Sequence, residues 1–186
     1  MSTTEIVAIV IAVIALAVAV LAFLQTQRTK RLRTRFGPEY DHVVDREGDR
    51  RRAEAELSHR EERVRKLNIR DLTRQEQERF ADAWRHQQSR FVDDPQAAAS
   101  EADTLVMEVM AARGYPTNDF STQVADLSVG HARVMGNYRE AHHIAERSRH
   151  GEASTEELRR AMICYRELFE DLLGSTVKHQ PEEVRR

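Results

Sequence analysis

The stretch Ile6–Leu24, IVAIVIAVIALAVAVLAFL, has no polar side chain in any of its 19 residues. As an α-helix it would be about 28 Å long, close to the ~30 Å hydrocarbon core of a bilayer. A core helix of a small soluble domain has one apolar face, whereas this segment is apolar on every side. We therefore expect residues 1–24 to be an N-terminal transmembrane anchor with a span at about residues 6–24.

A cluster of basic residues follows the apolar stretch. Residues 25–70 carry 14 Lys and Arg against 9 Asp and Glu, whereas Glu5 is the one charged residue before position 25. Positive charge favours the cytoplasmic side, so we expect a short N-terminus outside and the body inside a cell (inner or plasma) membrane. Five of these cations directly follow the span and would set its orientation. They also lie where anionic headgroups would be, and each would gain on the order of 1 kcal/mol of binding free energy from that surface. They are Arg28, Lys30, Arg31, Arg33 and Arg35.

Two other membrane arrangements are compatible with one apolar segment. A cleaved signal peptide has a basic N-terminal region and an apolar core of about 7–15 residues, and MSTTE supplies no base while the apolar stretch is longer. Ala17-Val18-Ala19 imitates a cleavage site but lies inside the apolar run. A secreted helical protein after cleavage stays open as an alternative, as does an anchor of the reverse orientation.

Alanines at spacings of three or four also make a homo-oligomer through the span a weak hypothesis.

The rest of the chain is mildly acidic. Residues 71–186 carry 15 Lys and Arg against 21 Asp and Glu, and the whole chain has a formal charge of −2. A nucleic-acid-binding domain would have a basic face, so we expect no nucleic-acid partner. The one cysteine, Cys164, excludes an intrachain disulfide and is expected to be a buried apolar side chain.

A helix break follows the basic cluster at Phe36-Gly37-Pro38, since glycine and proline both end helices and Pro38 suits the first turn of a new one. The very polar residues 39–67 then place acids four residues before bases, an order that stabilises a helix. Gly48 weakens the pattern near its middle. We expect residues 25–72 to form an Arg-rich juxtamembrane segment and a charged, exposed helical stalk that packs one thin stripe against the body.

Three helix starts are indicated in the body. Thr73-Arg74-Gln75-Glu76 has the form of a capping box, and Asp94-Pro95 has the form of an N-cap followed by the first helical residue. Ser154-Thr155-Glu156-Glu157 begins the last helix. Between these, apolar residues recur at spacings of three and four, which predicts helices with one buried face.

The helix ends are marked by glycine. Gly114 ends one helix and Gly174 the last, while a segment from about Asp119 to Arg149 could be divided at Gly130 and Gly136. With no strand alternation anywhere, we expect an all-α protein in which residues 73–174 form a small antiparallel helical bundle. Residues 175–186 are expected to be a disordered tail.

Two Glu-x-x-His pairs are the sharpest signs of chemistry, because such pairs on facing helices bind two metal ions in ferritin-like bundles. Glu140 of the pair Glu140/His143 points away from the apolar face of its helix, and Glu56/His59 lies in the charged segment. His142 lies on an apolar stripe, as a packed core histidine does. We expect no catalytic residue, cofactor or metal, and keep a metal-dependent enzyme of a helical bundle as an alternative.

Three stretches carry a resemblance to a known family: RFGPEYDHVV, GDRRRAEAELSHREERV and RFVDDPQAAASEADTLVMEVMAARGYP. With them, the chain resembles uncharacterised bacterial single-span membrane proteins with an RFGPEYD-type juxtamembrane motif and a helical cytoplasmic region. The likeness covers roughly residues 34–172. It implies no catalytic or cofactor residue.

Together these patterns predict a membrane-anchored helical protein that serves as an interaction or scaffold module at the cytoplasmic face of a bacterial membrane. Its expected partners are the lipid bilayer with its anionic headgroups and an unknown protein.

Overall fold

The computed structural model describes residues 3–174, and the side chains of residues 11–174. Within that part the chain is helical and has no strand, so the predicted all-α class is confirmed. The chain divides into two compact units, Met1–Leu57 and Ser58–Arg186, which differ in their boundaries from the predicted anchor, stalk and bundle. The predicted disordered tail, 175–186, lies outside the described residues.

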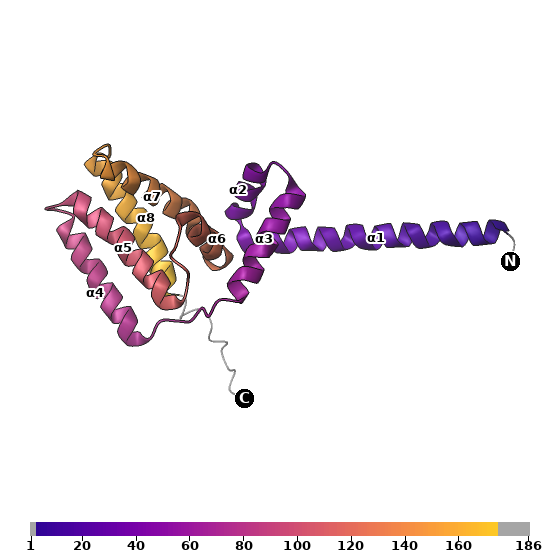
Figure 1. Ribbon diagram of the computed structural model, residues 1–186, viewed down its shortest axis with the longest axis horizontal. Coiled ribbons are helices and arrows are strands. Elements are labelled where there is room, and N and C mark those ends of the chain that lie inside the picture. Colours follow the sequence, from indigo (N-terminus) through magenta and orange to yellow (C-terminus); the bar gives the residue numbers. More distant parts are fainter. Residues whose placement is uncertain (1–2, 175–186) are drawn as a thin grey trace, which may run out of the picture. The chain divides into compact units, whose positions relative to one another are not determined.

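The first unit begins with a long helix, α1 (Thr3–Phe36), of 34 residues and about 51 Å. It ends at Gly37, after which α2 (Pro38–Glu47) starts on a proline, as the sequence predicts. A third helix, α3 (Arg50–Arg65), contributes its residues 50–57 to this unit. The three helices are the indigo and violet elements of Figure 1.

A tight turn separates α2 from α3, so the predicted single stalk helix over 39–67 is in fact two helices. Gly48 has a φ of 64°, a left-handed conformation that glycine adopts at low cost, and its N–H donates to Val44 O at 2.9 Å. The Asp49 carboxylate then accepts from Arg52 N at 2.9 Å and caps α3. A helix-ending glycine beside a helix-starting aspartate reverses the chain within two residues.

The turn lets α2 and α3 bury a small apolar cluster with the end of α1. Leu32 and Phe36, four residues apart on one face of α1, are both 0% exposed. The sequence predicts an exposed stalk that packs one thin stripe, and Val43, Ala53 and Leu57 of that segment are indeed buried. Tyr40 is buried as well.

Five helices make up most of the second unit. Helix α8 packs against both α5 and α7, α4 packs against α5, and α6 leads into α7 through a 3-10 turn at Ala132–Val134. This break lies between the two glycines at which the sequence allowed one. The helices are α4 (Arg74–Arg90), α5 (Pro95–Arg113), α6 (Phe120–His131), α7 (Met135–Arg149) and α8 (Thr155–Gly174).

The predicted helix starts are confirmed by their hydrogen bonds. Thr73 and Glu76 form the capping box of α4, and the Asp94 carboxylate accepts from Ala97 N at 3.0 Å at the start of α5. At the start of α8 the Ser154 hydroxyl accepts from Glu157 N, and the Glu157 carboxylate accepts from Ser154 N at 2.8 Å. The starts of α4, α5 and α8 are therefore determined by local sequence.

Apolar side chains from all five helices fill the bundle. The single tryptophan, Trp84, stacks on Phe169 with ring centroids 4.8 Å apart, so it is a core residue as predicted. Residues 58–65 of α3 join this unit through polar contacts to α6. Arg63 pairs with the buried Asp126 carboxylate at 2.7 Å, and the buried Arg60 donates to Ser128 Oγ at 3.2 Å.

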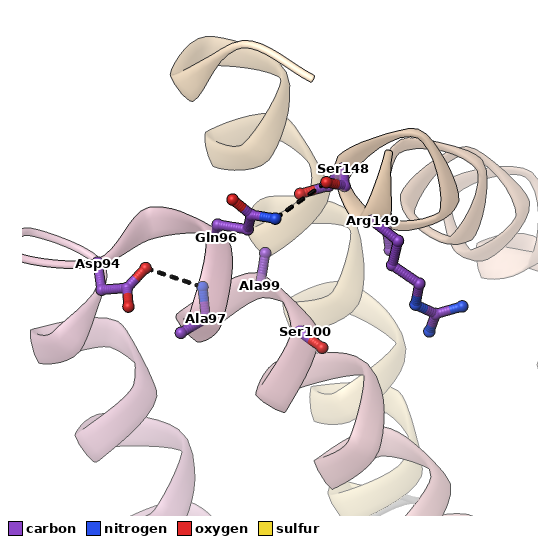
Figure 2. A pocket seen from close by; sticks show the side chains of 8 residues that line it. Asp94, Gln96, Ala97, Ala99, Ser100, Ser148 and Arg149 are labelled. Carbon is purple, nitrogen blue, oxygen red and sulfur yellow. Dashed lines mark hydrogen bonds between the residues drawn. The ribbon is translucent and has the colours of Figure 1, made fainter. Parts of the chain in front are cut away.

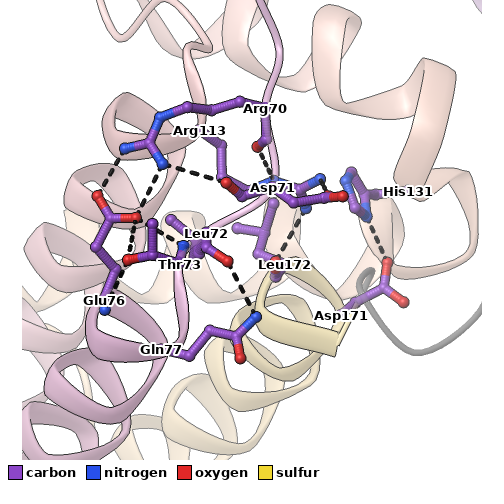
Figure 3. A network of polar contacts seen from close by, with 10 residues as sticks. All are labelled: Arg70, Asp71, Leu72, Thr73, Glu76, Gln77, Arg113, His131, Asp171 and Leu172. Atoms are coloured by element: carbon purple, nitrogen blue, oxygen red, sulfur yellow. Dashed lines mark hydrogen bonds and ion pairs between the residues drawn. The ribbon is translucent and has the colours of Figure 1, made fainter.

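The segment between α3 and α4 is fixed to the ends of α5 and α8 (Figure 3). Arg70 N donates to Arg113 O, and the buried Arg113 guanidinium donates to Leu172 O, both at 2.9 Å. Gly114 has a φ of 92°, and a Cβ there would lie 2.5 Å from Asn68 O, so only glycine lets the segment approach this closely.

Candidate membrane-surface site

The apolar part of α1 is not covered by protein. Leu16 is 66% exposed and Phe23 is 63% exposed. One helix of the described residues, Ile11–Phe36, is long and apolar enough to span a membrane, and none of its apolar window is buried. A contiguous exposed apolar surface of this kind is typical of a segment that contacts a membrane or another protein, and signal sequences share it.

Three of the five predicted topology residues line one groove. They are Arg28, Lys30 and Arg33, whereas Arg31 and Arg35 are exposed outside its lining. A helix rotates by about 100° per residue, so Arg28 and Lys30 reach this groove from its two edges.

The opposite wall of the groove is the start of α3. Arg50 and Arg51 add two cations, and Asp49 and Glu54 add two carboxylates. We call this feature, with a volume of about 970 Å³, the juxtamembrane groove. Its lining also includes Ala22, from the apolar part of α1.

Glu54 holds the two walls together. It is 12% exposed and accepts from Thr29 Oγ1 at 2.6 Å and from Tyr40 OH at 2.9 Å. Burial raises the pKa of Tyr40, so the phenol remains a hydrogen-bond donor at neutral pH. Arg50 pairs with the same carboxylate at 3.3 Å, and Arg28 donates to the backbone carbonyl of Glu54 at 3.3 Å. The groove is therefore a defined feature of the unit.

The other cations of the groove are paired less fully with carboxylates of the chain. Arg33 pairs with Asp41 at 3.0 Å, an exposed contact of low strength. Within residues 3–174, neither Lys30 nor Arg51 takes part in an ion pair. Five cations against two carboxylates leave the lining positively charged, which suits an anion.

The sequence does not predict the contribution of α3, because the pattern over residues 39–67 favours one continuous helical stalk. The signal was present in Gly48-Asp49, where a helix-ending residue directly precedes a helix-starting one. Reading that pair as a turn brings Arg50 and Arg51 back toward α1.

A second polar cluster lies inside the bundle around the buried Asp103. Its carboxylate lies 3.5 Å from the Arg149 guanidinium and 4.0 Å from His142 Nδ1. Burial raises the pKa of Tyr138 and of Tyr165, so both phenols stay protonated. The His142 ring stacks on Phe120 at 3.7 Å, which gives it the packing role that the sequence predicts.

The Glu-x-x-His pairs do not converge on one point. Glu140 pairs with Arg160 at 2.6 Å, and His143 is exposed. In the described part of the chain, no three His, Cys, Asp or Glu side chains are placed to hold a metal ion. Cys164 is buried, and burial raises the pKa of its thiol, which disfavours the reactive thiolate.

Among the hollows on the described part of the bundle are two pockets. One, of about 360 Å³, lies between the start of α5 and the end of α7, where Gln96 Nε2 donates to Ser148 O at 3.0 Å (Figure 2). Its charged groups are Arg149 and Asp94, and Asp94 is already used as a helix cap. The other, of about 140 Å³, is a groove between α4 and α8 in which Trp84, Phe91, Met162 and Ile163 are joined by the polar residues Gln88, Arg159 and Arg166.

Comparisons with protein-family models, with curated proteins and with solved structures gave no match. The predicted resemblance to single-span bacterial proteins therefore stays a prediction, and the function is argued from the residues of this chain.

Proposed function

We propose that the chain is a single-pass membrane protein whose helical body acts as an interaction or scaffold module at the cytoplasmic face of a bacterial membrane. The observation that carries the proposal is the uncovered apolar surface of α1, which ends where basic residues begin. Lipid is the cover that fits this surface, because its length matches the hydrocarbon core.

The orientation rests on the distribution of charge. The span is followed by Arg28 and Lys30 within six residues of Leu24, whereas no Lys or Arg precedes it. Short basic segments stay on the cytoplasmic side, so the N-terminus is outside and the body is inside.

The interaction role is supported by the surface of the bundle. Ile163 is 45% exposed at the centre of α8, and the α4/α8 groove is also lined by Phe91, Met162 and the two arginines Arg159 and Arg166. Aromatic, methionine and arginine side chains are enriched in protein interfaces. The groove is small, so the contact is one anchor of a larger interface.

Cysteine labelling tests the topology. In a Cys164→Ala background, Ser2→Cys and Ser100→Cys are each labelled with a membrane-impermeant maleimide in right-side-out membrane vesicles. We expect Ser2→Cys to react and Ser100→Cys to react only after detergent is added. The opposite pattern contradicts the orientation. A mature chain that starts near residue 20 in mass spectrometry establishes the secreted alternative instead.

Photo-cross-linking tests the interaction role. A photoreactive side chain at position 163 is expected to capture one protein reproducibly from native membranes. The matched control is position 74, because Arg74 is 91% exposed on the same bundle. Equal capture from both positions contradicts a docking role for the α4/α8 groove.

Stoichiometric transition metal in the purified full-length chain, retained through dialysis, favours the metalloenzyme alternative.

A further inference from the structure

We propose that the juxtamembrane groove binds a lipid headgroup that carries two phosphate groups. The proposal rests on the membrane anchor proposed above and adds a ligand to it. The groove is not the same as the predicted topology cluster. It includes Arg50 and Arg51 from α3, and its lining leaves out Arg31 and Arg35.

The charge of the lining selects the class of ligand. Its side chains carry three more positive than negative charges, and Glu54 is already engaged by Thr29, Tyr40 and Arg50. One phosphodiester carries a charge of about −1, so two phosphates on one headgroup neutralise the groove more fully. Arginine matches phosphate well because its guanidinium donates two parallel hydrogen bonds.

The position of the groove along α1 selects a lipid over a soluble anion. Arg28 lies four residues beyond Leu24, about 6 Å along the helix, and Lys30 lies about 9 Å beyond it. The headgroup layer of one leaflet is about 5–8 Å thick. Ala22 in the lining shows that the groove continues into the apolar part of α1. A lipid therefore offers phosphate to the cations and acyl chain to the apolar end.

The groove is also held in shape before any ligand binds. Thr29 and Tyr40 fix Glu54, and Glu54 fixes the first turns of α3 against α1. Arg50 and Arg51 thus project from a wall that is already in place. A preorganised set of cations loses less conformational entropy on binding than five mobile side chains would.

Native mass spectrometry of the full-length protein in detergent micelles tests the proposal. The probes are diphosphatidylglycerol with two phosphates, phosphatidylglycerol with one, and zwitterionic phosphatidylcholine, all with the same acyl chains. We expect one bound diphosphatidylglycerol per chain, at least fivefold weaker binding of phosphatidylglycerol, and no retained phosphatidylcholine. Equal binding of the one- and two-phosphate lipids overturns the proposal.

Matched charge removal tests the location. Lys30→Gln with Arg51→Gln removes one cation from each wall without breaking an ion pair among the described residues. We expect roughly 10- to 30-fold weaker binding of diphosphatidylglycerol. Arg31→Gln with Arg35→Gln removes the same charge outside the lining, and we expect less than a threefold change. Equal losses from the two variants, with unchanged circular dichroism, overturn a defined site in favour of diffuse attraction.

Soluble pyrophosphate separates the two sources of phosphate. At equal concentration, we expect it to displace little of the bound diphosphatidylglycerol. Full displacement overturns the lipid and assigns the groove to a soluble diphosphate. Failure of the anchor itself gives a different result, since the chain would then leave membranes in an alkaline wash whatever the groove binds.

Discussion

Helices α1 and α8 are both rich in apolar residues, yet their apolar side chains meet different surroundings. Leu16 on α1 is 66% exposed, whereas Leu168 on α8 is fully buried among the other helices of the bundle. The bundle supplies its own cover for α8, and no part of the described chain does so for α1. The comparison separates an apolar helix that the protein itself covers from one whose cover, in the proposal above, is lipid.

Charge placed in α1 is expected to have the largest effect. Val13→Arg with Leu16→Arg puts two arginines near the centre of the span, where each costs about 2.5–3.5 kcal/mol of insertion free energy. We expect most of the chain to leave the membrane in an alkaline wash, whereas Val13→Ala with Leu16→Ala stays in the pellet. A double-arginine variant that also stays would show that lipid does not cover α1.

A substitution that creates a cavity in the bundle is expected to have the second-largest effect. Leu168→Ala removes a fully buried side chain, and such changes lower the free energy of unfolding by about 2–5 kcal/mol. Guanidinium unfolding of the full chain in micelles, followed by the fluorescence of Trp84, measures this loss. The matched change Leu16→Ala is expected to leave that transition unchanged. Equal losses from both would contradict the division between the two helices.

Loss of the buried ion pair between α3 and α6 is expected to be milder. Arg63→Gln leaves the buried Asp126 carboxylate without its charged partner, which costs about 1–3 kcal/mol of unfolding free energy. The loss of unfolding free energy is limited because Arg63 is 32% exposed, so solvent partly screens the pair. Arg74→Gln breaks an exposed pair with Glu78 and is expected to change stability by less than about 0.5 kcal/mol.

The smallest effect concerns pH. Hydrogen bonds from Ser154 N, then from the Ser154 hydroxyl and from Arg147, lower the pKa of Glu157 from 4.5 to about 2. Because the folded-state pKa is depressed, the stabilisation is present above about pH 4.5 and is lost as the pH falls toward 2. We expect Glu157→Gln to melt below the wild type at pH 7 and to match it near pH 2. A constant difference in melting temperature across that range would contradict this origin.

Much of the fold follows from local sequence. The caps at Thr73, Asp94 and Ser154, the end at Gly114 and the break before α7 are all marked by residues adjacent to them. These features need only neighbouring backbone groups, so a sequence pattern suffices to predict them.

The candidate site was predicted only in part, because it depends on contacts between distant residues. Thr29 and Glu54 are 25 positions apart, and neither has a pattern that indicates the other. The same holds for Arg63 and Asp126, which are 63 positions apart. Spacing along a helix identifies cations that follow a span, but it cannot show which of them face a second helix.

The hydrogen bonds of Arg70 and Arg113 have a mechanical consequence (Figure 3). A pull on residues 66–69 reaches the ends of α5 and α8 at Arg70 and Arg113, where Leu172 O also lies. The load is therefore divided among several hydrogen bonds before it reaches α4 and its capping box at Thr73. A chain tethered at one end gains resistance to force from this arrangement, at the cost of one glycine, Gly114, that no other residue can replace.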